Sequence, residues 1–122
     1  MAAVSIAFEA PEQASGSRAG SERPIDLVHL AVQTMGDKLL EAEVLQLFNR
    51  QARAALAELS SGSPKAVVAS AHRLKSAANG VGAFKVAAHA QSLENDPQDA
   101  AARAALRAAV VETENFILRL SR

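Results

Sequence analysis

The sequence predicts an all-α fold, an antiparallel four-helix bundle with one short additional helix at its N-terminal side. The chain has 122 residues, of which 49% are hydrophobic and only 3% aromatic, so its core must be built largely from Leu, Val, Ile and Ala. Ala and Leu are strong helix formers. From Pro24 onward, apolar residues recur at steps of three and four, and short connections separate the periodic stretches. One helical domain is therefore expected.

The beginning of the chain differs in composition from the rest. Residues 1–23 are rich in Gly, Ser and other polar residues and contain Pro11, so we expect them to form a flexible tail. Residues 24–122 are expected to form the helical bundle. Its first element is predicted to be a short helix that ends near Gly36.

Capping residues predict the next two helices. Asp37 can cap the second helix, because its carboxylate can accept a hydrogen bond from a backbone N–H of the first turn. That helix should continue to residues 60–62. Ser63 is expected to cap the third helix, with Pro64 at its first position, where the missing N–H costs little. The third helix is expected to end near Asn79.

Two glycines, Gly80 and Gly82, predict a break or a sharp bend after the third helix. A fourth helix is expected over residues 83–94, followed by a turn at residues 95–97. The last helix should then extend over residues 97–120. Because these connections are short, neighbouring helices should run antiparallel.

Charge and composition exclude several classes of function. The 13 basic and 13 acidic residues give a formal net charge of zero, and no basic stripe with interleaved aromatic residues is present, so no nucleic-acid partner is expected. The chain has no cysteine, which removes disulfides and thiolate chemistry and fits a reducing compartment. No apolar run is long enough to span a bilayer, and the N-terminus lacks a basic leader. We therefore expect a cytoplasmic protein with no membrane partner.

The third predicted helix carries the chemically informative side chains. With successive residues about 100° apart around the helix axis, its two sides differ in polarity. One side is apolar and predicted to be buried, and it comprises Val67, Ala71, Leu74 and Ala78. The other side is polar and comprises Lys65, His72, Lys75, Ser76 and Asn79. His72 should therefore face solvent, with Lys75 about one turn away on the same face.

His72 is the candidate for covalent chemistry. Its neighbours Ala69 and Ser76 are small, so they leave the ring accessible from outside. A neutral imidazole nitrogen is a competent nucleophile toward a phosphoryl group. Lys75 places positive charge where the negative charge of a phosphorylated ring would develop. Asn79 is a candidate for hydrogen bonding to a phosphate or to a partner's backbone.

The run Ala71-His72-Arg73-Leu74-Lys75-Ser76 is followed by Gly82, ten residues after the histidine. This pattern resembles the signature of the histidine-containing phosphotransfer (HPt) domain family, A-H-x-L-K-G with glycine at the same offset. The resemblance implies that His72 is phosphorylated, that Lys75 stabilises the phosphate, and that Gly82 lies in a bend that lets the next helix pack closely. Ser76 stands where the family usually has glycine.

The resemblance also implies the partners. These would be receiver domains of response regulators or of hybrid histidine kinases, which supply Mg²⁺ and most of the catalytic groups. The chain itself is then expected to be a monomeric phosphoryl carrier in a phosphorelay, not an enzyme, with no cofactor of its own. The expected contact surface comprises Val68, Ala69, Ser76, Asn79, Gly82 and Phe84. No metal site is expected, because neither His29 nor His89 has another His or Cys at ligand spacing.

Two other functions remain open. The first is a mimic of the dimerisation domain of a histidine kinase, in which an acidic residue commonly follows the histidine and a proline comes slightly later. Here Arg73 follows His72, and the next proline after the histidine is Pro97, which disfavours this function. The second is a helical protein-interaction module that has no phosphocarrier activity. Replacing His72 with glutamine distinguishes such a module from a carrier.

Overall fold

The computed structural model describes residues 23–121, which contain five α-helices and no strand, so the all-helical prediction is confirmed. The flexible tail expected for residues 1–23 lies, apart from Arg23, outside the described residues. Within the described part of the chain, no helix is long and apolar enough to cross a membrane. The helices are α2 (Leu27–Gln33), α3 (Lys38–Ser61), α4 (Pro64–Val81), α5 (Phe84–Asn95) and α6 (Ala100–Leu120).

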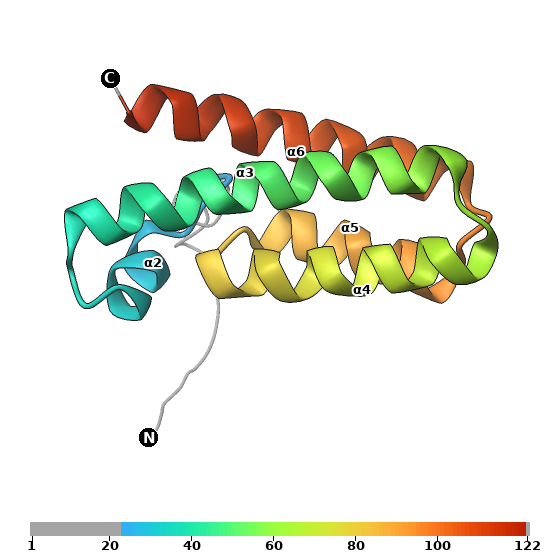
Figure 1. Ribbon diagram of the computed structural model, residues 1–122, viewed down its shortest axis with the longest axis horizontal. Helices are drawn as coiled ribbons and strands as arrows, with labels where there is room; N and C mark the ends of the chain where they lie inside the picture. The colour runs from blue at the N-terminus through green and yellow to red at the C-terminus, as the bar shows by residue number, and fades with distance from the viewer. Residues whose placement is uncertain (1–22, 122) are drawn as a thin grey trace.

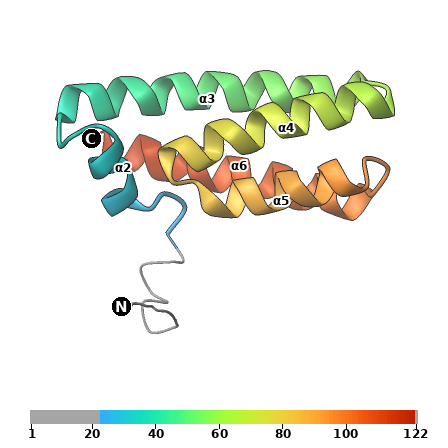
Figure 2. The same ribbon diagram turned by 90° about the horizontal axis from the view of Figure 1, so that it is seen from below.

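The four long helices lie side by side, and the short helix α2 lies at one end of them (Figure 1). The chain reverses direction from α3 to α4, from α4 to α5 and from α5 to α6 (Figures 1 and 2). Helix α4 packs against α3 and α5, and α6 packs against α5 and α3. Helix α2 packs against α4. The core therefore lies between the four long helices.

Capping side chains begin four of the five helices. In each case the side-chain oxygen of the residue before the helix accepts a hydrogen bond from a backbone N–H of the first turn, which satisfies a donor that has no partner within the helix. The caps predicted for α3 and α4 are confirmed. The capping residues are Asp26 (α2), Asp37 (α3), Ser63 (α4) and Asp99 (α6).

Two predicted helix boundaries are corrected by the structure. The predicted start of the last helix at Pro97 is wrong, because Asp99 caps α6 and the helix begins at Ala100. Helix α4 ends later than expected, at Val81. It stops there because Gly82 adopts a left-handed conformation with φ of 87°, which reverses the chain and is favourable only for glycine.

The predicted apolar stripe of α4 is buried. Val67, Ala71, Leu74 and Ala78 each expose at most 2% of their surface. They join a single core cluster to which all five helices contribute. The largest fully buried apolar side chains of that cluster are Phe48, Ile25, Leu30, Leu74, Leu93, Leu106 and Ile117.

Helices α4 and α5 make the most extensive helix–helix contact of the bundle. Several of their buried positions hold alanine, whose small side chain lets two helix backbones approach closely. Polar side chains at the solvent edge of this pair are therefore within reach of one another. The buried alanines are Ala71 and Ala78 on α4 and Ala87 and Ala90 on α5.

Replacing Asp99 with alanine is expected to lower the free energy of unfolding by ~0.5–2 kcal/mol, because the Ala102 N–H loses its acceptor. That hydrogen bond is 3.1 Å long. Urea denaturation measures the change. Asp99→Asn is the control, since it keeps a side-chain oxygen and should retain most of the stability. An equal loss in both variants would mean that the cap hydrogen bond is not what stabilises α6.

Candidate functional site

His72 lies near the middle of α4 with 59% of its side chain exposed, as the helical periodicity predicted. Its Nδ1 atom is 2.8 Å from Oε2 of Glu94, which projects from α5. Within the described residues, Nε2 makes no hydrogen bond. The ring is therefore held at one nitrogen and open at the other.

Lys75 lies one turn after His72 and contacts the same carboxylate. Its Nζ is 2.9 Å from Glu94 Oε1 and donates a hydrogen bond of 2.8 Å to Gln91 Oε1. Glu94 Oε1 is buried and accepts no hydrogen bond within the described residues, so this ion pair compensates for its burial. The lysine side chain is only 21% exposed, and its ammonium contacts two side chains of α5.

The side chains of Lys75 and His72 determine the ionisation of Glu94. The Lys75 ammonium, and after it the His72 ring, hold the pKa of the Glu94 carboxyl below its usual value of 4.5, although partial burial opposes this effect. Glu94 is therefore ionised at neutral pH. One negative charge lies between the imidazole and the ammonium.

The charge of Glu94 fixes the tautomer of a neutral His72 ring. An ionised carboxylate only accepts hydrogen bonds, so the nitrogen that faces it, Nδ1, must carry the proton. The lone pair then lies on Nε2, on the open side of the ring. When Nε2 bonds to an electrophile, the ring gains positive charge, which Glu94 stabilises as the aspartate of a Ser-His-Asp triad stabilises its imidazolium.

The lowered pKa of Glu94 predicts a pH dependence of stability. Because the pKa is depressed in the folded state, the contribution of Glu94 is fully present above its usual value of 4.5 and is lost as pH falls through the folded pKa. Urea denaturation of wild type and Glu94→Gln between about pH 6 and pH 3 should show the advantage of the wild type shrinking at the acid end. A constant difference over that window would contradict the ion pair.

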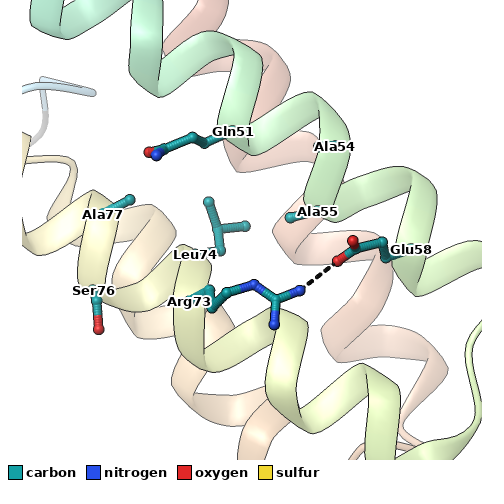
Figure 3. Close-up of a pocket in the computed structure, with 8 residues that line it drawn as sticks. All are labelled: Gln51, Ala54, Ala55, Glu58, Arg73, Leu74, Ser76 and Ala77. Atoms are coloured by element: carbon teal, nitrogen blue, oxygen red, sulfur yellow. Dashed lines mark hydrogen bonds and ion pairs between the residues drawn. The ribbon is translucent and has the colours of Figure 1, made fainter.

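A hollow of about 480 Å³ lies between α3 and α4 (Figure 3). Gln51 on α3 and Ser76 on α4 are among its lining residues. Arg73, which follows His72 directly, turns toward α3, where its guanidinium donates a hydrogen bond of 2.7 Å to Glu58 Oε1. The Ser70 hydroxyl donates to the same oxygen at 2.7 Å. His72 therefore contacts Glu94 of α5, while the next residue, Arg73, lines the hollow toward α3.

The expected contact residues do not all lie at the surface. Ala69, Ser76 and Asn79 on α4 are exposed, and Val68 is half-buried. Phe84, at the start of α5, is 44% exposed.

Gly82 is buried at the end of α4, where its carbonyl accepts a hydrogen bond of 2.9 Å from the Asp26 N–H. We therefore leave it out of the proposed contact surface. The bend implied for Gly82 is present, and it brings α2 as well as α5 close to α4.

Sequence reasoning gave no role to Glu94 or Gln91, the two α5 side chains that complete the site. A signal for both was present. Ala83 lies between α4 and α5. His72 lies eleven residues before Ala83, and Glu94 lies eleven residues after it. Lys75 lies eight residues before Ala83, and Gln91 lies eight residues after it. In an antiparallel pair of helices, positions equidistant from the connection lie side by side.

His29 has different surroundings from His72. The His29 ring on α2 packs edge-on against the Phe84 ring, with centroids 5.1 Å apart. Residues 23–121 contain no cluster of three or more His, Asp or Glu side chains that could hold a metal ion.

Comparison with protein families matches residues 43–120, more than half of the chain, to the Hpt domain. No curated protein and no solved structure matches the chain. The matched range includes all of α4 and α5, and with them His72, Lys75, Gln91 and Glu94. Hpt domains are phosphotransfer modules of two-component signalling that carry the phosphoryl group and do not catalyse its transfer. This chain belongs to the Hpt domain family.

Proposed function

We propose that this chain is a phosphorelay intermediate whose antiparallel bundle, residues 24–122, carries a phosphoryl group on His72. The donor is either the aspartyl phosphate of a receiver domain or a histidine kinase. The acceptor is the aspartate of a response regulator. One observation supports this assignment most directly. An exposed imidazole is bound through Nδ1 by a carboxylate that also binds a lysine one turn away, which leaves Nε2 free.

The transfer step follows from this geometry. The lone pair of His72 Nε2 attacks the phosphorus of the aspartyl phosphate, the P–N bond forms, and the P–O bond to the aspartate breaks, so the aspartate leaves as a carboxylate. The Nδ1 proton stays on the ring, where Glu94 stabilises the positive charge. Lys75 offers its ammonium to the phosphoryl oxygens. Mg²⁺ and the remaining groups come from the receiver.

A partner that transfers a phosphoryl group to Nε2 must dock over α4. The neighbouring exposed side chains of Ala69 and Ser76 are small, so they do not cover the His72 ring. The hollow between α3 and α4 provides a depression beside it, lined by polar Gln51 and by alanines. Phe84 adds exposed apolar surface at the far end of α4, where α5 begins. We propose that a receiver domain contacts these features transiently, over a small apolar surface with a polar rim.

The test is intact-mass spectrometry under neutral conditions after mixing the protein with a phosphorylated receiver domain and Mg²⁺. Wild type should gain one acid-labile phosphoryl group. His72→Gln should gain none. His89→Gln, which changes a histidine on α5 instead of α4, should behave as wild type.

Two results would count against the proposal. Phosphate on the His72→Gln variant would place the carrier elsewhere. Failure of the wild type with a panel of receivers would favour an interaction module.

A further inference from the structure

A chain of hydrogen bonds continues from Lys75 along the exposed side of α5. Lys75 Nζ donates to Gln91 Oε1 at 2.8 Å. Gln91 Nε2 in turn donates to Asn95 Oδ1 at 2.9 Å, one helical turn further along α5. Within the described residues, neither amide side chain forms a hydrogen bond with His72, and the transfer step described above uses neither of them. Their position suggests that they act on Lys75.

The series of hydrogen bonds from Lys75 to Asn95 has one favourable direction. A glutamine amide has an acceptor end and a donor end. Because Asn95 presents its oxygen to the NH₂ end of Gln91, the carbonyl end of Gln91 faces the ammonium. The reversed amide would place NH₂ against a cation and oxygen against oxygen. The contacts of Gln91 with Asn95 and with Lys75 therefore favour the same orientation of the Gln91 amide.

One hydrogen bond and one ion pair hold the Lys75 ammonium, and they leave it able to donate to a phosphoryl oxygen. Lys75 has three N–H donors. Gln91 Oε1 accepts a hydrogen bond from one of them at 2.8 Å, and Glu94 Oε1 forms an ion pair with the ammonium at 2.9 Å. A lysine side chain loses considerable rotamer freedom when it is fixed, and here that loss precedes the arrival of a phosphoryl group. An N–H of Lys75 that does not donate to Gln91 can then bind a phosphoryl oxygen without breaking the contacts with Gln91 and Glu94.

We propose that Gln91, oriented by Asn95, is a positioning residue that fixes the Lys75 ammonium beside His72 before phosphoryl transfer. This inference rests on the proposed phosphocarrier function. Gln91 does not touch the reacting atoms. It acts by keeping the cation of Lys75 at the site where the negative charge arrives.

The first experiment compares wild type with Gln91→Met, which keeps the length of the side chain and removes the acceptor. Gln46→Met is the matched control, because Gln46 lies on α3 in a pocket lined by residues of α2, α3 and α6 and by none of α4 or α5. The initial rate of phosphoryl acceptance from a phosphorylated receiver should fall roughly three- to tenfold in Gln91→Met and stay unchanged in Gln46→Met. An unchanged rate in Gln91→Met would overturn the proposal.

Two Asn95 variants test the orientation of the amide. Asn95→Ala removes the oxygen that Gln91 binds, so it should slow acceptance in the same direction as Gln91→Met. Asn95→Asp keeps an oxygen at that position and should restore most of the rate. If alanine and aspartate have the same effect, then Asn95 does not act through its oxygen, and this part of the proposal fails.

A second readout needs no phosphoryl group. The NH₃⁺ of a lysine held by hydrogen bonds exchanges slowly with water, so Lys75 should give a ¹H–¹⁵N signal in the unphosphorylated wild type, assigned by its absence in Lys75→Arg. Gln91→Met should lose or broaden that signal. The ¹⁵N shifts of His72 should not change, because Glu94 still binds Nδ1. Retention of the Lys75 signal in Gln91→Met would refute the positioning role.

The two readouts separate this inference from the proposed function. If wild type accepts no phosphate but its Lys75 signal depends on Gln91, the phosphocarrier function fails while the hydrogen-bonded lysine stands. If wild type accepts phosphate and Gln91→Met is indistinguishable from it in both measurements, the carrier stands and the positioning role of Gln91 is wrong.

Discussion

Replacing Gly82 with alanine is expected to lower the free energy of unfolding by ~3–5 kcal/mol, from left-handed strain and a backbone overlap together. Gly82 has φ of 87°, a conformation that costs a residue with a Cβ about 1–2 kcal/mol. An added Cβ would lie 2.9 Å from the Asp26 carbonyl oxygen and 3.3 Å from the Asp26 nitrogen. Backbone atoms cannot rotate away as a flexible side chain can, so α2 would have to shift.

The displacement of α2 would reach the core. The Asp26 N–H donates to the Gly82 carbonyl oxygen at 2.9 Å, and this hydrogen bond joins the beginning of α2 to the end of α4. Ile25 and Leu30, on either side of that bond, are fully buried. Moving α2 outward therefore opens apolar surface as well as breaking a hydrogen bond. Hydrogen exchange of the α2 amides should rise in the Gly82→Ala variant even where the remaining helices stay folded.

Two other glycines separate the causes. Gly36 has φ of 77° with nothing within 4 Å of an added Cβ, so Gly36→Ala tests conformational strain alone and should cost ~1–2 kcal/mol. Gly80 lies in α4 with the same open space and no left-handed backbone, so Gly80→Ala should stabilise the protein by ~0.5–1 kcal/mol.

Urea denaturation of the three variants measures these differences. A Gly82→Ala loss no larger than that of Gly36→Ala would show that the approach of α2 to α4 is not rigid.

The helices could be predicted because their signals are local. Asp37 and Ser63 stand directly before apolar periodic stretches, and each acts as the predicted cap. The start of α6 was placed too early because Pro97 is acceptable at a first helical position. Asp99, two residues later, offers a carboxylate to the Ala102 N–H, and that cap determined the boundary.

The site could be predicted only in part, because half of it comes from another helix. His72 and Lys75 share one helix, so periodicity alone placed both on the solvent side. Glu94 and Gln91 reach them across the α4–α5 contact, which depends on how closely two helices approach. Buried alanines such as Ala78 and Ala90 allow that approach, and the approach itself is known only once the two helices are packed together. Gly82 carried a clear turn signal, but its contact with Asp26 depends on the tertiary position of α2.

Glu94→Gln is expected to slow phosphoryl acceptance by His72 by roughly ten- to a hundredfold, because the amide cannot stabilise a positively charged ring as a carboxylate does. Glutamine can still accept a hydrogen bond from Nδ1, but it can also present its NH₂, so the Nδ1–H tautomer is no longer enforced. In a fraction of the molecules the proton then lies on Nε2 and blocks the attacking nitrogen. The reduction should be smaller than in a fully buried triad, since His72 is 59% exposed and solvent also stabilises the charged ring.

Two measurements on Glu94→Gln identify the cause of the slow transfer. The ¹⁵N shifts of the His72 ring in the unphosphorylated protein should report the Nδ1–H tautomer in wild type and a mixture of tautomers in the variant. The initial rate of acceptance from a phosphorylated receiver should fall in parallel.

The matched control is Glu114→Gln. Glu114 forms an ion pair with Arg53 across α3 and α6, so the control also removes a paired carboxylate, but not one near His72. That variant should keep both the wild-type tautomer and the wild-type rate.

The competing explanation is that Glu94 acts only through Lys75, whose Nζ lies 2.9 Å from Glu94 Oε1. Lys75→Met separates the two roles, because it removes the cation and leaves the carboxylate on Nδ1. If Glu94 supports the ring directly, combining Glu94→Gln with Lys75→Met should slow acceptance beyond the effect of Lys75→Met alone. If the double variant is no slower than Lys75→Met, Glu94 matters only as the anchor of the lysine, and the tautomer argument for Nε2 is wrong.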